Sequence, residues 1–168
     1  MLSLSQTTGY AIKALACLNE PACDCQQTAN IAECSGVPRP YLSKIIQSLA
    51  RGGLVIAKRG IGGGIRLSRP PEQISLLEIV EAVEGEEWLG DCLLGMDECS
   101  NQVTCPTHDF WQRISREIRD ELGKTTLASV ITFKQNRRCR TAKALPAGAR
   151  RSKPAPASRP VMKTPTPK

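Results

Sequence analysis

The stretch CLLGMDECSNQVTCPTH, residues 92–108, holds three of the chain's eight cysteines and its single histidine. Pro106 suits the first position of a helix, so we expect Cys105 at the helix N-cap, where the helix dipole lowers the pKa of a thiol. His108 follows three residues later, about one helical turn, and can share a face with Cys105. The loops before Cys105 can fold back to bring in two more thiolates. The candidate metal ligands are therefore Cys92, Cys99, Cys105 and His108.

Thiolates combined with an imidazole suit zinc or an iron–sulfur cluster and do not suit calcium or magnesium. The spacing alone does not separate zinc from an iron–sulfur cluster. The cysteines could instead be unrelated packing residues, but the segment MDECSNQVT is polar and would make a poor core. Cys105 and His108 could form a nucleophile pair, yet the sequence has no evident orienting group or substrate cleft, so we expect no enzymatic activity.

The N-terminal stretch MLSLSQTTGYAIKALACLNE carries neither a basic leader nor a small-residue cleavage site. No apolar run approaches the ~18 residues of a membrane span. We therefore expect a cytoplasmic protein with no membrane association. Thiols stay reduced in that compartment, which favours metal or redox chemistry over a disulfide framework. Cys23 and Cys25, with Cys17 and Cys34 nearby, could form a second thiol site.

Charge is distributed unevenly along the 168-residue chain, whose net charge is +7. Residues 1–133 contain 12 basic and 16 acidic residues, whereas residues 134–168 contain 11 basic residues and no acidic one. The segment between Cys34 and Pro71 also lacks acidic residues, which indicates a phosphate-binding surface more than an ordinary solvated face. Its seven basic residues are Arg39, Lys44, Arg51, Lys58, Arg59, Arg66 and Arg69.

Helices must position these groups, and three are predicted in the first third of the chain. Residues 4–20 have helical periodicity, and residues 28–36 form a short helix that ends at Gly36. Residues 37–53 form a further helix with its prolines in the first turn, where they are tolerated. Two short helices joined by a tight turn with glycine make a helix-turn-helix. The apolar faces of the first and third helices are Ala11, Ala14, Leu15 and Leu18, and Leu42, Ile45, Ile46 and Leu49.

The stretch LVIAKRGIGGGIRLS, residues 54–68, predicts a β-hairpin. Val55 and Ile56 begin one strand, Ile65 and Leu67 form its partner, and RGIGGG is the turn. A phosphate-binding glycine loop would need a following helix, but this stretch runs into Pro70 and Pro71. A β-hairpin directly after a helix-turn-helix is a wing, and its glycines let the backbone lie close to DNA.

Two further helices are predicted over residues 75–85 and 107–125, and residues 125–132 form a last short packing element. The helix of residues 107–125 carries one narrow apolar stripe among charged residues, which favours dimerisation. Residues 134–168 are rich in Pro, Ala, Lys and Arg, so we expect a disordered tail that either attracts nucleic acid or solubilises the chain. The stripe consists of Trp111, Ile114, Ile118 and Leu122.

Residues 1–133 resemble the Rrf-type family of winged-helix transcription regulators. The resemblance is carried by TTGYAIKAL, IAECSGVPRPYLSKIIQSLARGGLV, RGIGGGIRLS and SLLEIVEAVEG. It implies a mainly α fold with a small β wing, divided into a winged helix-turn-helix domain (1–71), a segment with the ligand loop and dimerisation helix (72–133), and the basic tail (134–168). CPTHDFWQRISREIRDELGKTTLASVI is most similar to the iron–sulfur cluster regulators within the family.

The resemblance implies a 2Fe–2S cluster held by the three cysteines and the histidine of residues 92–108. A 4Fe–4S sensor of nitric oxide or iron, and a structural-zinc protein that binds nucleic acid without sensing, are the alternatives. The gap of six residues between Cys92 and Cys99 is one longer than in the 2Fe–2S regulators. Some 4Fe–4S relatives take a carboxylate ligand from the first helix, but Gln6, Thr7 and Thr8 supply none, which favours His108.

The family's mode of action implies a homodimer that reads a palindromic operator in double-stranded DNA, as a repressor or otherwise, with control by iron–sulfur status, redox state or nitric oxide. We expect the helix of residues 38–52 in the major groove and the wing along the minor groove. Arg59 is the expected minor-groove contact by charge and by its match to the family. Ser43 replaces a glutamate that helps those regulators to select DNA. The remaining expected DNA contacts are Tyr41 and Lys44 near the helix start, and Arg39 and Lys58 at phosphates.

Overall fold

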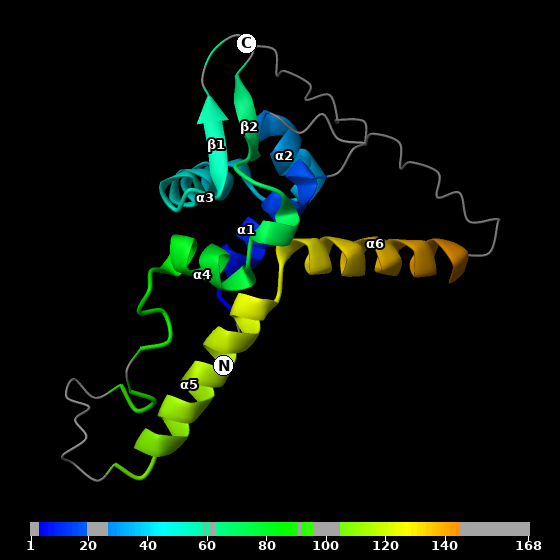
Figure 1. Cartoon of the computed structure of the whole chain (residues 1–168). Coiled ribbons are helices and arrows are strands. Elements are labelled where there is room, and N and C mark those ends of the chain that lie inside the picture. Colours follow the sequence, from blue (N-terminus) through cyan, green and yellow to red (C-terminus); the bar gives the residue numbers. More distant parts are fainter. Residues whose placement is uncertain are drawn as a thin grey trace, which may run out of the picture.

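The computed structural model describes residues 4–19, 27–58, 60, 63–90, 92–95 and 105–144. It is mainly helical with one two-stranded antiparallel sheet (Figure 1), as the sequence predicts. The elements in chain order are α1 (Gln6–Leu18), α2 (Thr28–Ser35), α3 (Arg39–Arg51), β1 (Val55–Lys58), β2 (Gly64–Leu67), the 3₁₀ turn η1 (Pro71–Gln73), α4 (Leu76–Glu84), α5 (His108–Lys124) and α6 (Leu127–Ala144).

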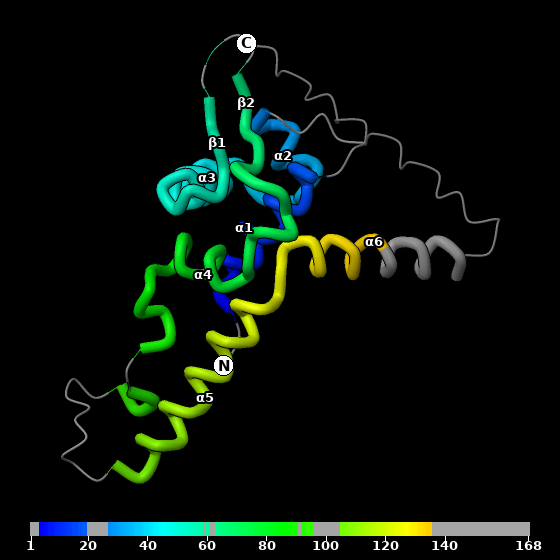
Figure 2. Tube along the Cα trace, viewed as in Figure 1, coloured from blue at the N-terminus to red at the C-terminus, as the bar shows by residue number. Residues whose placement is uncertain are grey.

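Helix α1 forms the centre of the hydrophobic core, and α2, α3 and α4 all pack against it (Figure 2). Ala11, Ala14 and Leu15 are fully buried, as the helical periodicity predicts. The small side chains of α1 let the neighbouring helices approach closely. Each fully buried Leu or Ile stabilises the fold by about 1.5–3 kcal/mol. The largest buried side chains of the other elements include Ile31, Leu42, Ile45, Leu49, Leu54, Ile74 and Ile79.

The turn between α2 and α3 confirms the predicted helix-turn-helix. Gly36 caps α2 in the left-handed conformation with φ 68°, and its N–H donates to the carbonyl of Ala32. Pro38 then occupies the N-cap of α3 in an extended conformation, so α3 leaves in a new direction. The predicted stripe of Leu42, Ile45, Ile46 and Leu49 is buried, which turns the opposite face of α3 to solvent.

Strands β1 and β2 form the predicted wing. They pair antiparallel, with Val55 opposite Leu67 and Lys58 opposite Gly64. Val55 and Ile65 are buried on the core, and this anchors the base of the hairpin beside α3. At the tip, the N–H of Gly63 donates to the carbonyl of Gly60, while residues 59, 61 and 62 lie outside the described residues.

The starts of α4 and α6 are joined through the backbone. The N–H of Leu76 donates to the carbonyl of Thr125 at 2.8 Å, and the N–H of Leu127 donates to the carbonyl of Ile74 at 2.8 Å. These two bonds fix the corner from which α5 and α6 leave the body in different directions (Figure 1). Across the described ranges, no helix is both long enough and apolar enough to span a bilayer.

The sequence predictions for α6 are wrong in two respects. The short element expected over residues 125–132 is the start of an 18-residue helix, and residues 134–144, expected to be disordered, continue that helix to Ala144. The physical reason is local composition, because Gln, Arg, Lys and Ala are good helix formers and no proline occurs between Leu127 and Pro146. The rest of the tail lies outside the described residues.

A capping box starts α4 and also holds the chain that leaves the wing. The hydroxyl of Ser75 accepts from the N–H of Glu78 at 3.2 Å, and the Glu78 carboxylate accepts from the N–H of Ser75 at 2.9 Å. Arg69 forms an ion pair with the same carboxylate. Burial raises the pKa of Glu78, but the hydrogen bonds from Ser75 and Arg69 and the charge of Arg69 together lower it below its ordinary value.

Replacing Glu78 by Gln should lower the free energy of unfolding at pH 7 by about 1 kcal/mol, a value reduced for the partial exposure of the ion pair. Because the pKa of Glu78 is lower in the folded state, its stabilisation is fully present above the unfolded pKa of about 4.3 and is lost as the pH falls through the folded pKa. Urea unfolding of both proteins at pH 7 and pH 3 measures this. The exposed Glu72→Gln variant is the control, and a difference between Glu78→Gln and the native chain that stays constant with pH would contradict the assignment.

Candidate nucleic-acid interface and metal centre

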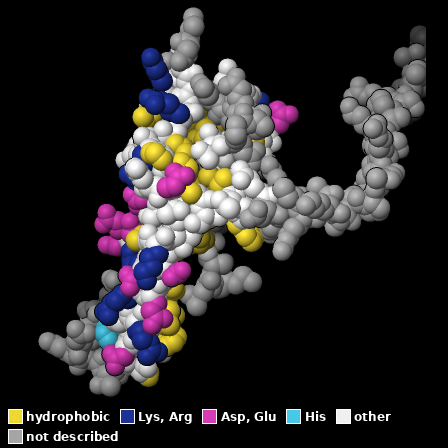
Figure 3. All heavy atoms as spheres, turned by 45° about the vertical axis from the view of Figure 1, so that its right-hand side comes forward, with side chains coloured by type: hydrophobic (Ala, Val, Ile, Leu, Met, Phe, Trp, Pro, Cys, Tyr) yellow, Lys and Arg dark blue, Asp and Glu magenta, His cyan; other side chains and the backbone are white. Residues whose placement is uncertain are grey.

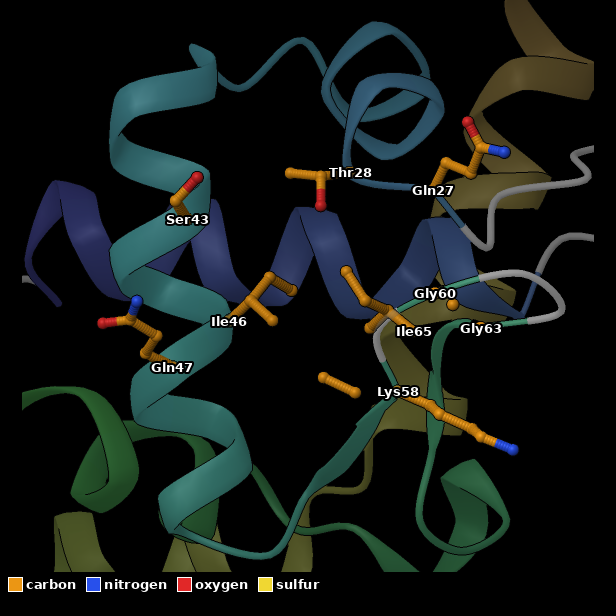
Figure 4. Close-up of a pocket in the computed structure, with 11 residues that line it drawn as sticks. Gln27, Thr28, Ser43, Ile46, Gln47, Lys58, Gly60, Gly63 and Ile65 are labelled. Atoms are coloured by element: carbon orange, nitrogen blue, oxygen red, sulfur yellow. The ribbon is translucent and has the colours of Figure 1, made fainter.

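A groove of about 560 Å³ lies between the exposed face of α3 and the wing (Figure 4). Ser43 and Gln47 line it from α3, and Lys58 lines it from β1. Ile46 and Ile65 also line this groove and connect it to the core. The remaining lining residues are Gln27 and Thr28 at the start of α2, and Ala57, Gly60, Gly63 and Gly64 in the wing.

Lys58 is the basic residue among those that line this groove, and further exposed basic side chains lie on α3 and the wing. Figure 3 shows Lys and Arg side chains standing beside the wing at the top of the molecule. Arg69 is an exception among the basic residues of the segment 34–71, because its ion pair with Glu78 uses it to support α4. Arg59 lies outside the described residues. The exposed basic residues of the segment are Arg39, Lys44, Arg51, Lys58 and Arg66.

The expected contact residues on α3 are all exposed, but two of them have partners within the chain. Tyr41 is 57% exposed, and its ring lies 6.2 Å from that of Tyr10 on α1. The hydroxyl of Ser43 donates to the carbonyl of Arg39 at 3.3 Å, within its own helix. These contacts give Tyr41 and Ser43 defined positions on the outer face of α3, whereas the exposed Lys44 is held by no contact of this kind among those described here.

The start of α5 differs from the sequence prediction. The helix begins at His108 with Thr107 at the N-cap, so Cys105 is not the N-cap and Pro106 is not the first helical residue. The reason is a turn ahead of the helix, in which the N–H of His108 donates to the carbonyl of Cys105 at 3.2 Å. This correction moves the helix start by two residues and leaves the Cys105 thiol just ahead of it.

The Cys105 thiol is nevertheless stabilised in its ionised form, as the sequence predicts. A hydrogen bond from the Thr107 hydroxyl lowers the pKa of Cys105 below its ordinary value, and the N–H groups of Thr107 and His108 act in the same direction. Burial and the nearby Cys92 thiolate raise that pKa, but by less. The Thr107 hydroxyl, with nearby backbone N–H groups, thus lowers the pKa of this thiol as the helix dipole was expected to do.

The candidate metal ligands are only partly placed. Cys92, Cys105 and His108 are half-buried, and Cys99 lies outside the described residues. Within the part of the chain that the structure describes, no three His, Cys, Asp or Glu side chains come close enough to hold a metal ion. The donor set still fits a soft metal, because Cys105 has a stabilised thiolate, Cys92 is near enough to influence it, and His108 supplies an imidazole at the helix start.

Helix α5 extends away from the body as an arm. Trp111, predicted to lie in a dimer interface, is 5% exposed within its own chain, and its indole N–H donates to the carbonyl of Gly90 at 3.1 Å. Ile114 and Ile118 are half-buried, and Leu122 packs against the core. Phe110, four residues before Ile114, is 49% exposed. The apolar residues of α5 therefore divide between an inner contact at Trp111 and a more open edge.

Contacts run from this arm through α4 to α3. Arg119 of α5 forms a 3.3 Å ion pair with Glu81 of α4 and donates to the carbonyl of Glu86 at 2.8 Å. Next to Glu81, Ala82 packs against Gly52 at the end of α3 so closely that a Cβ on Gly52 would lie 2.7 Å from the Cβ of Ala82. Helix α4 thus connects α5 mechanically to α3.

The sequence model of Rrf2, described as an iron-dependent transcriptional regulator, matches residues 4–132. The chain belongs to the Rrf2 family. A proposed HTH-type transcriptional regulator of Haemophilus influenzae is 36% identical over 110 residues, 66% of this chain and 73% of the relative. IscR of Vibrio parahaemolyticus is 33% identical over 104 residues, 62% of this chain and 61% of the relative.

Solved structures agree with the family assignment. The structure of T. potens IscR has a TM-score of 0.59 and 25% identity, over 79% of this chain and 88% of that one. The oxidised form of Staphylococcus aureus CymR has a TM-score of 0.56 and 26% identity, over 77% and 96%. This Rrf2 protein is therefore a transcriptional regulator with a winged-helix fold rather than an enzyme, as the sequence predicts.

Sequence reasoning missed three features of this Rrf2 protein. Gln47 lines the groove and could have been found, because it lies four residues after Ser43 on the same helical face. Phe110 could have been found by the same spacing from Ile114. Cys17 and Cys34 were named only as neighbours of a possible second thiol site around Cys23 and Cys25, and their close approach to each other has no further signal in the sequence.

Proposed function

We propose that this Rrf2 protein is a homodimeric regulator that binds a palindromic operator and that an iron–sulfur cluster at residues 92–108 controls its DNA affinity. The observation that carries the proposal is the groove between α3 and the wing, lined by Ser43, Gln47 and Lys58, on a chain matched to the family over residues 4–132. A helix of this kind fits the major groove of B-DNA, and an adjoining hairpin can then follow the neighbouring backbone.

The roles of the groove residues follow from their chemistry and position. Ser43, Lys44 and Gln47 project from the outer face of α3 and reach base edges, with Gln47 suited to adenine. Arg39 and Lys58 bind phosphates and set the register of the protein on DNA. Arg59, which follows Lys58 in the sequence, is the proposed minor-groove contact, and Tyr41 packs beside the DNA backbone.

The dimer proposal rests on α5, all of whose residues are described. Trp111 is the one buried residue among its 17 residues. A helix with so little tertiary packing is marginal in water, so the arm requires a partner. A second copy supplies it by covering Phe110, Ile114 and Ile118, and the two-fold symmetry then presents two α3 helices to two half-sites.

The proposed cluster ligands are Cys92, Cys99, Cys105 and His108. A bound 2Fe–2S cluster would supply a redox-active link between the segment around residues 92–99 and the start of α5. The chain's part is to stabilise the Cys105 thiolate through Thr107 and to carry any displacement of α5 to α3 through α4. The family description as iron-dependent and the IscR relatives favour iron over structural zinc. A 4Fe–4S cluster is the second candidate.

Replacing Arg59 by Ala should weaken operator binding and relax preference at minor-groove positions, with a cost of about 1–3 kcal/mol. Replacing Lys58 by Ala should instead weaken binding to all sequences evenly and reduce the slope of log affinity against log salt by about 1. Fluorescence anisotropy on duplexes chosen from a random library, at several salt concentrations, measures both. Lys124→Ala, at the end of α5, is the control. Native behaviour in both wing variants would show that another surface binds DNA.

Anaerobic purification followed by visible absorption and by iron and sulfide analysis tests the cluster. We expect a coloured protein with about two iron atoms and two sulfides per chain, and a spectrum changed by His108→Cys. About four iron atoms would indicate a 4Fe–4S sensor. A colourless protein with one zinc ion would leave DNA binding intact and contradict cluster control.

A further inference from the structure

A second pair of cysteines lies inside the winged-helix body. The Sγ atoms of Cys17 on α1 and Cys34 on α2 are 2.6 Å apart, although the residues are 17 positions apart in sequence. Both residues belong to the hydrophobic core or border it, and neither is among the candidate ligands of residues 92–108. The packing of α1 against α2 therefore places two sulfurs where a covalent bond requires only a small further approach.

The two thiols differ in access to solvent. Cys17 is fully buried, whereas Cys34 is half-buried near the end of α2. A reagent in solution can therefore reach Cys34 directly, whereas Cys17 has no exposed surface and contacts the sulfur of Cys34. Reversible oxidation sites commonly combine an accessible cysteine with an adjacent resolving cysteine, and this pair has that arrangement.

We propose that Cys34 and Cys17 form a reversible thiol–disulfide site, with Cys34 as the nucleophilic thiol, Cys17 as the resolving thiol, and low-molecular-weight disulfides as the oxidant. The Cys34 thiolate attacks one sulfur of such a disulfide, whose S–S bond breaks, and one small thiol leaves with a proton. Cys17 then loses its proton and attacks the Cys34 sulfur, and the second small thiol leaves. The protein loses two electrons and two protons, and the small disulfide gains them.

The bond would form without rebuilding the DNA-binding face. The end of α2 is already fixed, because the hydroxyl of Ser35 donates to the carbonyl of Ile31 and Gly36 closes the helix. The side chains of Tyr41, Ser43 and Lys44 are exposed on α3, whereas Cys17 is buried. Oxidation should therefore protect Cys34 from further reaction while α1 and α2 keep their positions. This site is independent of the proposed cluster.

The test is treatment of the full-length reduced protein with oxidised glutathione, followed by mass spectrometry after proteolysis. Cleavage after Glu33 separates Cys34 from Cys17, Cys23 and Cys25, so a bridge appears as two linked peptides. We expect the native chain to form the Cys17–Cys34 bridge, to retain no glutathione on Cys34, and to return to thiols with dithiothreitol. A Cys23→Ser, Cys25→Ser double variant is the matched control and should behave identically.

The Cys17→Ala variant tests the resolving role, since alanine suits the small-residue packing of α1. It should keep one glutathione on Cys34. The Cys34→Ser variant should keep none on the peptide that begins after Glu33. The proposal is overturned if native Cys34 retains glutathione or pairs with Cys23 or Cys25. Should Cys17→Ala fail to fold, as judged by circular dichroism, the Cys23→Ser, Cys25→Ser control still decides the question, because Cys17 is then the sole cysteine on the peptide that can be linked to Cys34.

Discussion

The burial of one face of α3 is the constraint on which the rest of this molecule depends. Leu42, Ile45 and Leu49 enter a core built around α1, and together they contribute several kcal/mol to its stability. Because these residues must face inward, Ser43, Lys44 and Gln47 must face outward. The buried residues of the wing use the same core, so the groove between α3 and the wing has a fixed width and a fixed set of side chains.

The two proposed thiol sites differ in their relation to this core. Cys17 and Cys34 meet between helices whose positions are set by close packing, so their approach is part of the fold. Cys92 and Cys105 lie at the far end of the α5 arm, where the described contacts are fewer and the thiolate is stabilised by nearby N–H and O–H groups. Under the proposed function, binding or loss of a cluster changes the arrangement of the side chains at this end of the arm. Helix α4 contacts both α5 and α3 and can transmit that change.

Much of this architecture could be predicted from sequence because it rests on local signals. Gly36, the prolines at the start of α3 and the glycines of the wing each mark a turn that only certain backbone conformations allow. The start of α5 could not be predicted in the same way, because Pro106 fits both a first helical turn and the turn that precedes Thr107. The continuation of α6 was missed because disorder was predicted from the average composition of residues 134–168. That average hides the high helix propensity of residues 134–144.

The candidate site could be predicted in its residue types but not in its assembly. Their residue types and close spacing mark Cys92, Cys105 and His108 as candidate ligands for a soft metal. The arrangement of their side chains depends on tertiary contacts that the spacing does not encode. Trp111 illustrates this, since its place in an apolar stripe was predicted but its inward direction follows from the carbonyl of Gly90. The closeness of Gly52 to Ala82 is likewise a property of the packed helices α3 and α4.

The central claim is that occupancy of the site at residues 92–108 controls DNA binding through α5 and α4. The most direct measurement is the operator affinity of one anaerobic preparation before and after removal of its iron, at fixed salt concentration. The account predicts that the two affinities differ by about fivefold or more, which is the range of typical coupling between sites. It also predicts that a Cys92→Ala, Cys99→Ala, Cys105→Ala triple variant matches the iron-free protein. Equal affinities in all three samples would contradict the account.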